Sequence, residues 1–211
     1  MILTLLGTRK LDMLPVVVKQ IPKSRITSHI GTLPPEIHFH LKATGADGVC
    51  PLLDFFERRT SWVLVLARNK NSIDLFELSS QYGALGEDAA RIILRQVVQT
   101  SISLAKRGVF HRDIKDENIL VDTRTLHTQL IDFGCATVYE NRNYDELMGT
   151  PEFFPPEYYT TRCYKAEKST VWTIGILMYV LLIGDIPFDT EKQIINCSRT
   201  KVNRQNINNR S

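Results

Sequence analysis

The chain has 211 residues, 43% of them hydrophobic, so it is long enough and apolar enough to bury a substantial core. Its 26 Lys and Arg residues exceed its 23 Asp and Glu residues by only three, and four of the basic residues lie in the last fourteen positions with no acid among them. The positive excess therefore belongs to the C-terminal tail and argues against a basic face for nucleic acid.

Cysteine usage and hydropathy indicate a protein of the cell interior. Cys50, Cys135, Cys163 and Cys197 show neither the paired spacing of a zinc site nor a disulfide framework. The apolar start of the chain is too short for a signal sequence. The longest apolar run, 171–183, has thirteen residues, which is too short to cross a bilayer and fits a buried helix. We expect a cytoplasmic protein without a membrane contact, with the nucleus as the alternative location.

The first 67 residues show the pattern of a small sheet with one helix. Residues 14–21 are β-branched and apolar around Lys19, which predicts a strand. Pro34, Pro35 and Glu36 then have the composition of a helix start before the apolar residues 37–41. Residues 52–57 and 62–66 predict two further strands, joined by a charged turn.

The chain after residue 72 is expected to be mainly helical. Asp74 begins a short helix, and residues 87–107 repeat apolar side chains with a helical period before Gly108, a typical C-terminal cap. The run 171–183 predicts a central helix. After Phe188 no helical apolar period is evident, and residues 198–211 are expected to form a polar, disordered tail.

The stretch from His111 to Gly134 carries the chemistry. It contains Asp113, Lys115 and Asn118 at close spacing, followed at hairpin distance by Asp132 in an Asp-Phe-Gly triplet. Phosphoryl transfer needs a base for the attacking hydroxyl, a cation near the moving phosphoryl group and oxygen ligands for Mg²⁺. Asp113 is predicted to be the base and Lys115 the cation, while Asn118 and Asp132 are predicted to hold the metal.

These motifs resemble the protein kinases, and the resemblance implies a two-lobed α+β fold that uses ATP and Mg²⁺. It implies a small lobe at 1–67, a hinge at 68–72 and a large lobe at 73–197. Lys19 is then expected to hold the α- and β-phosphates, and Glu36 to orient Lys19, although a first-turn Glu is also a common helix cap. Ala67 and Asn69 are expected to contact adenine through the backbone, and Asp132 to contact the nucleotide through Mg²⁺.

Within the kinases the sequence is similar to the Pim family of serine/threonine kinases. The resemblance rests on Ile114–Val121, Gln129–Gly134, Pro155–Glu157 and Gly184–Phe188. It implies activity without activation-loop phosphorylation, and substrates with arginines ahead of the target Ser or Thr. Residues at the matching substrate-binding positions are Asp74, Asp116, Glu117, Thr150 and Asp185, and Asp74 also borders the nucleotide. The alternative for the acidic four is a solvated rim without a binding role.

Three departures from the family pattern leave the activity open. Leu5-Leu6-Gly7 resembles the start of the glycine-rich loop, but the later glycines and the returning strand have no counterpart before Leu14. Asn69 and Asn71 replace hinge prolines, which adds a backbone donor for adenine. The C-terminal helices of the large lobe are expected to be missing.

The sequence thus predicts a monomeric, ATP- and Mg²⁺-dependent serine/threonine protein kinase that acts on basic protein substrates and binds no nucleic acid. Two alternatives remain: a catalytically impaired pseudokinase or decoy that acts as a binding module, and an incomplete gene product. The catalytic loop and the metal ligands favour the enzyme, whereas the shortened glycine loop favours the alternatives.

Overall fold

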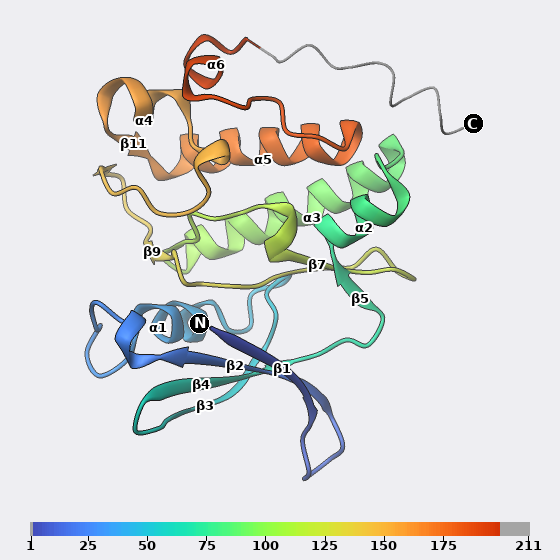
Figure 1. Ribbon diagram of the computed structural model, residues 1–211, viewed down its shortest axis with the longest axis vertical. Coiled ribbons are helices and arrows are strands. Elements are labelled where there is room, and N and C mark those ends of the chain that lie inside the picture. Colours follow the sequence, from blue (N-terminus) through green and yellow to red (C-terminus); the bar gives the residue numbers. More distant parts are fainter. Residues whose placement is uncertain (1, 199–211) are drawn as a thin grey trace.

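The structure is a computed structural model that describes residues 2–198, arranged as a small β-rich lobe and a larger, mainly helical one (Figure 1). The two-lobed α+β prediction is confirmed. The small lobe holds a four-stranded antiparallel sheet in the order β1-β2-β4-β3. Its elements are β1 (Leu3–Thr8), β2 (Pro15–Pro22), the 3-10 turn η1 (Lys23–Arg25), α1 (Pro35–Ala43), β3 (Leu52–Glu57) and β4 (Ser61–Ala67).

The large lobe surrounds the segment that carries the motifs. A three-stranded sheet in the order β5-β7-β8 lies below the helices, and two short strand pairs, β6 with β9 and β10 with β11, frame the loops. The elements are β5 (Ser72–Asp74), α2 (Leu75–Tyr82), α3 (Glu87–Lys106), β6 (Val109–Phe110), η2 (Asp116–Asn118), β7 (Ile119–Asp122), β8 (Thr128–Leu130), β9 (Thr137–Val138), β10 (Asn143–Tyr144), η3 (Pro151–Phe153), α4 (Pro156–Thr161), β11 (Tyr164–Lys165), α5 (Ala166–Ile183) and α6 (Glu191–Asn196).

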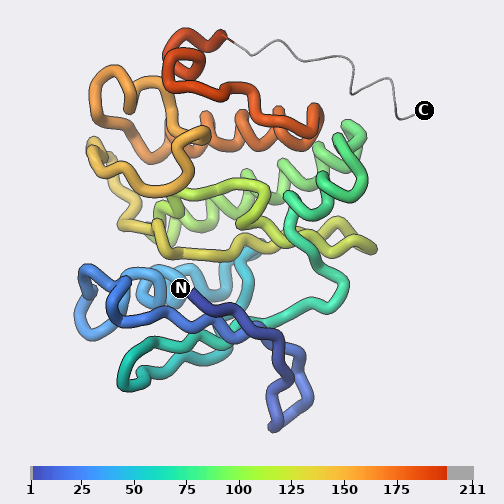
Figure 2. The backbone as a smooth tube through the Cα atoms, viewed as in Figure 1, coloured from blue at the N-terminus to red at the C-terminus, as the bar shows by residue number. Residues whose placement is uncertain are grey.

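The predicted strands correspond closely to the strands observed. The predicted strand 14–21 forms β2, and residues 52–57 and 62–66 form β3 and β4. The segment 68–72 runs from the end of β4 to the start of β5 and is the crossing between the lobes seen in Figure 2. Residues 9–14 form a turn and contain no further strand. β1 therefore pairs directly with β2, with Leu5 opposite Val18.

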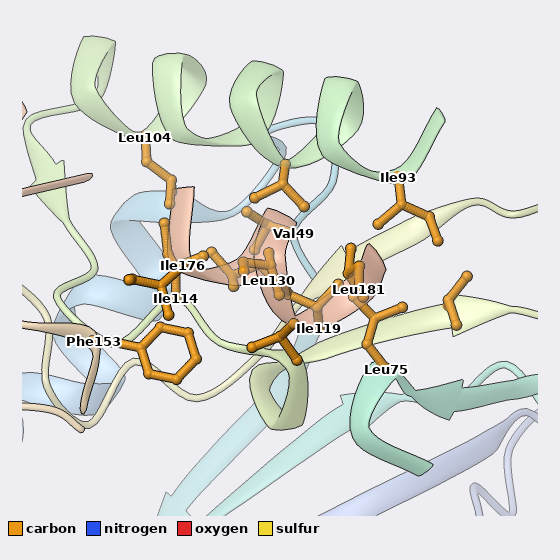
Figure 3. Close-up of a cluster of buried hydrophobic side chains, with 14 of the residues drawn as sticks. Val49, Leu75, Ile93, Leu104, Ile114, Ile119, Leu130, Phe153, Ile176 and Leu181 are labelled. Atoms are coloured by element: carbon orange, nitrogen blue, oxygen red, sulfur yellow. The ribbon is translucent and has the colours of Figure 1, made fainter. Parts of the chain in front are cut away.

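One continuous core holds the catalytic segment against the helices. Ile93 and Leu104 of α3 face Ile176 and Leu181 of α5, as Figure 3 shows. Ile114, directly after Asp113, and Ile119, directly after Asn118, belong to the same core. Burying an aliphatic side chain contributes about 1.5–3 kcal/mol, so the loop between these two anchors is held by the packing.

Helix α5 is longer than the sequence predicts. It begins at Ala166, five residues before the apolar run, because the first-turn residues Ala166 and Ser169 are themselves buried. Among the described residues it is also the one helix with the length and mean hydropathy (1.4) to cross a membrane. It packs against α3 and supplies four side chains to the core, so we interpret it as the central helix of the lobe.

The expectation of no helix after Phe188 is wrong for the described residues. Residues Glu191–Asn196 form α6, which starts with a capping box between Thr190 and Gln193. The physical reason is local: the two side chains satisfy the backbone donors that begin a helix, so even a short apolar pair is sufficient. The predicted disorder of the tail falls, apart from Ser198, outside the described residues.

Candidate active site

The catalytic loop is fixed at both ends by buried side chains. It leaves β6 at Phe110 and returns to β7 at Ile119. His111 is fully buried, and its Nε2 lies 3.1 Å from the carbonyl oxygen of Ile131. Arg112 donates from Nε to the carbonyl oxygen of Cys135 at 2.6 Å. These bonds connect the loop to the segment around Asp132, so the two motifs form one site.

Asp113 sits at the centre of a hydrogen-bond network. The side-chain Nδ2 of Asn118 donates to its Oδ2 and to its carbonyl oxygen, both at 2.8 Å. The hydroxyl of Thr150 donates to Oδ1 at 2.8 Å. Two donors therefore fix the carboxylate in one orientation while leaving lone pairs for a further donor, which is the arrangement a general base requires.

Lys115 lies on the same side of the loop as Asp113. Its Nζ is 4.0 Å from Oδ2 of Asp113 and forms an ion pair with Glu117. Partial burial alone would lower the pKa of Lys115, but its hydrogen bond with Glu117 and the charge of Asp113 outweigh burial and raise the pKa. Lys115 therefore stays positive beside the carboxylate.

A three-member charge network joins the two lobes. Nζ of Lys19 on β2 lies 2.6 Å from Oε1 of Glu36 on α1 and 2.9 Å from Oδ2 of Asp132. Burial alone would raise the pKa of Asp132, but the Lys19 ammonium outweighs it and lowers the pKa below its ordinary value. Glu36 thus makes the contact expected from the sequence, in addition to starting its helix.

The site holds two residues in the left-handed backbone region. Arg112 has φ +68° and Asp132 has φ +61°, and strain of this kind costs about 1–3 kcal/mol per residue and gathers at functional sites. Gly149 has φ +110°, and a Cβ on it would lie 2.6 Å from the carbonyl oxygen of Arg112. Only glycine can therefore bring Thr150 so close to Asp113.

Sequence reasoning did not identify an aromatic column that supports the network. The ring of His40 packs on Phe133 at 4.6 Å between centroids, and His111 packs on Phe133 at 5.0 Å. His40 Nε2 lies 2.8 Å from the carbonyl oxygen of Cys50. The available signal was spacing, because His40 is four residues after Glu36 and so shares its helix face.

A second contact that sequence reasoning missed links the catalytic loop to the segment after Gly134. Arg112, whose side chain is almost fully buried, donates from Nη1 to Oε2 of Glu146 at 3.0 Å. An acid that pairs with a buried guanidinium holds this segment in place. The pair spans 34 residues, so no local pattern could have indicated it.

The hinge residues differ in how their backbone groups are used. The N–H of Ala67 donates to Pro51 at 3.0 Å, and its carbonyl oxygen accepts the weak Cys50 thiol bond at 3.4 Å. The side chain of Asn69 accepts from the N–H of Asn71 and donates to Asp122. No bond to the Asn69 N–H is found within residues 2–198. The Asn69 N–H is therefore available to adenine, as its position in the hinge would require.

The donor set at the predicted metal site suits Mg²⁺. Because Nδ2 of Asn118 is committed to Asp113, its Oδ1 is the atom left for a cation. The Asp132 carboxylate has lone pairs beyond its bonds to Gly134 and Lys19. Residues 2–198 contain no group of three or more protein ligands for a metal. Hard oxygen ligands in this number fit Mg²⁺ that completes its shell with phosphates and water.

The acidic residues expected to bind substrate do not form one exposed rim. Glu117 and Asp185 are exposed, and Asp74 is half-buried and caps α2 through the N–H of Glu77. Asp116 is only 8% exposed, and burial raises its pKa. Asp116 is therefore less accessible to a peptide than the other three acids, because η2 turns it inward beneath α2, and its substrate-binding role stays a prediction.

Comparisons with known proteins give the family. A model of the protein kinase domain matches residues 4–210. The serine/threonine-protein kinase pim-2 of Danio rerio is 36% identical over 203 residues, covering 90% of this chain and 66% of the relative. The serine/threonine-protein kinase prk-2 of Caenorhabditis elegans is 38% identical over 162 residues, covering 77% and 37%. The chain thus spans about two-thirds of the first relative and little more than a third of the second.

A more distant relative shows how far the likeness extends. The PAS domain-containing serine/threonine-protein kinase of Mus musculus is 32% identical over 181 residues, covering 82% of this chain and 13% of that protein. Each of the three matches covers more than three quarters of this chain. By the domain match, the relatives and the geometry of the catalytic loop, the chain belongs to the protein kinase family and is similar to its Pim-like serine/threonine members.

Proposed function

We propose that this chain transfers the γ-phosphate of ATP, with Mg²⁺, to a Ser or Thr hydroxyl of a protein substrate. The observation that carries the proposal is the contact of Lys19 with both Glu36 and Asp132, at 2.6 and 2.9 Å. In kinases a lysine–glutamate pair and a positioned metal-binding Asp must both be in place for transfer. Here one ammonium group satisfies both conditions.

The chain's own residues then have separate roles. Asp113 accepts the proton of the substrate hydroxyl as its oxygen attacks the γ-phosphorus, the bond to the β-phosphate oxygen breaks and ADP leaves. Lys115 places positive charge where the transferred group moves, and Asn118 orients Asp113 through its two bonds. ATP with Mg²⁺, when bound, supplies the phosphoryl group and neutralises its charge. Asn118 Oδ1 and Asp132 hold the metal.

The preference for Ser and Thr over Tyr rests on Lys115 and Thr150. Both residues, with Gly149 before Thr150, resemble the pattern of the serine/threonine kinases, and both lie beside the proposed base: Thr150 donates to Asp113 at 2.8 Å, and Lys115 lies 4.0 Å from it. The names of the relatives as serine/threonine kinases support the same preference.

For the substrate we propose a peptide with arginines ahead of the target residue. Glu117 and Asp185 are exposed acids of the large lobe, and Asp74 is partly accessible. Such charges attract basic peptides mainly by long-range steering, which salt weakens. Glu117 already pairs with Lys115. The solvated-rim alternative is tested by comparing peptides with and without arginine at low and high salt.

The rival proposal is a binding module without catalysis, and one observation favours it. β1 and β2 form a tight hairpin with Gly7 as the single glycine of the strand and its turn. Backbone N–H groups of a glycine-rich loop normally cover the phosphates. A chain without these backbone donors is expected to bind ATP weakly. It would then act only by binding other proteins.

Radiolabel transfer from ATP to matched Ser, Thr and Tyr peptides tests the proposal. We expect Mg²⁺-dependent labelling of the Ser and Thr peptides only. Asp132→Asn should abolish both labelling and the rise in melting temperature that Mg²⁺-ATP causes, because ligand binding to the folded state stabilises it. If the unmodified chain shows no labelling and also no thermal shift with Mg²⁺-ATP, the result favours the rival proposal.

A further inference from the structure

The small-lobe sheet has two edges that differ sharply in their protection. Edge strands expose unpaired backbone groups, and proteins usually protect them with charges, prolines or bulges. The β3 edge is protected in this way: its register shifts between Leu52 and Asp54, and Asp54 and Glu57 are charged. Glu57 also forms an ion pair with Lys23.

The β1 edge has no such protection. Its six residues, Leu3 to Thr8, contain no charge and no proline, and their register with β2 runs without a shift. Leu5 is 52% exposed and Leu6 65% exposed, although they point to opposite faces of the strand. Among the described residues, no strand pairs with the outer side of β1. Both its side chains and its backbone are therefore left without cover.

We propose that this edge pairs with β1 of a second copy of the chain, antiparallel, to form one continuous sheet across two small lobes. An antiparallel pair of identical strands has a natural two-fold axis, so one surface serves both copies. With the axis at Leu5, Leu5 of one copy lies opposite Leu5 of the other, and Thr4 of each copy lies opposite Leu6 of the other. Because the strand is uncharged, no like charges meet at the new pairing.

The position of the strand allows this approach. Figures 1 and 2 show β1 at the outside of the small lobe, with the turn that joins it to β2 projecting away from the body of the molecule. The charged turn residues Arg9 and Asp12 are already paired with each other. Pairing of six residues buries less than a stable dimer of ~1,600 Å². The association is therefore expected to be weak and concentration-dependent, and it replaces the expectation of a strict monomer.

A second apolar surface, between α3 and α5, is compared with the β1 edge as another place where two copies could meet. A groove of about 640 Å³ runs between α3 and α5, and Val98 and Met178 line it. Ile102, 50% exposed, lies in the adjoining 440 Å³ pocket of the same helix pair. Nothing in the structure shows what covers this groove, so it carries no proposal, but it could join two copies in another way.

Sedimentation velocity over a concentration series of the 211-residue chain tests the proposal. We expect the mass to rise from the monomer's 24.1 kDa towards that of a dimer. Leu5→Lys should remove the rise, because two ammonium groups then meet at the axis. Leu11→Lys, in the turn at an 89% exposed position, should leave it unchanged, as should Ile102→Lys in the pocket that adjoins the groove.

Hydrogen exchange keeps the proposal falsifiable if Leu5→Lys does not fold. In the unmodified chain, amides in residues 3–8 should exchange at least tenfold more slowly at high than at low protein concentration, while those of β3 stay unchanged. A monomer at all concentrations would overturn the proposal. So would a dimer that Ile102→Lys dissociates and Leu5→Lys does not, or one whose β1 amides gain no protection.

Discussion

At the scale of single residues, the site depends on side chains that are buried rather than exposed. His40 and His111 both pack on Phe133, and both are almost fully buried. Burial lowers the pKa of each imidazole, because the charged form loses its hydration. Burial therefore favours the neutral form of both histidines that pack on Phe133.

These pKa shifts predict a pH dependence of stability. Below the ordinary histidine pKa of about 6.5, the unfolded chain binds protons that the folded chain does not, so unfolding becomes easier as pH falls. The stability is fully present above that value and is lost below it. His40→Leu should reduce the loss of urea midpoint between about pH 7.5 and about pH 5.5. The exposed His127→Leu should not, and an equal loss in both variants and the unmodified chain would contradict this assignment.

Gly149 offers a second test at this scale. A methyl group there would meet the carbonyl oxygen of Arg112 at 2.6 Å, so Gly149→Ala should push Thr150 away from Asp113. We expect phosphoryl transfer to fall at least tenfold and stability to fall by about 1–3 kcal/mol. Gly31 also has a positive φ (+62°) but nothing within 4 Å of the position that a Cβ would take, so Gly31→Ala should cost backbone strain alone and leave transfer intact. Equal activities of the two variants would contradict the role of Gly149.

At the scale of elements, the sequence indicates what is decided locally. The strands β2, β3 and β4 and helix α3 carry their own periodicity and end signals, so they lie where the sequence predicts them, within one or two residues. The catalytic residues follow from motif spacing in the same way. The inward turn of Asp116, the placement of His40 beside Phe133 and the Arg112–Glu146 pair depend on contacts between distant segments, which no local pattern records.

Helix α6 lies between these cases, because its signal was local but easily missed. The Thr190 hydroxyl accepts from the N–H of Gln193 at 3.3 Å, and the side-chain oxygen of Gln193 accepts from the N–H of Thr190. Thr190→Ala should destabilise the chain by about 1 kcal/mol. Thr190→Ser, which keeps the acceptor, should cost far less in a urea titration. If the two substitutions cost the same, the capping box does not hold α6.

At the scale of the whole molecule, Lys19 and Glu36 of the small lobe contact Asp132 of the large lobe, and the proposed function depends on that junction. The fold and the catalytic set could be predicted because they share one motif-bearing segment from His111 to Gly134. The open edge of β1 could not, since it follows from the direct pairing of β1 with β2. Because the turn between β1 and β2 carries no glycine, phosphoryl transfer is the quantity that most directly separates the enzyme from the binding module.

The most direct test of the central claim compares Asp113→Asn with Asp47→Asn, an exposed aspartate outside the site. Each variant is assayed for Mg²⁺-dependent phosphoryl transfer and for the thermal shift with Mg²⁺-ATP. The account predicts that Asp113→Asn loses transfer by about 10²–10⁴-fold, the usual contribution of a general base, while its thermal shift is retained. Asp47→Asn should match the unmodified chain in both assays. Transfer by Asp113→Asn at the parent rate would contradict the account.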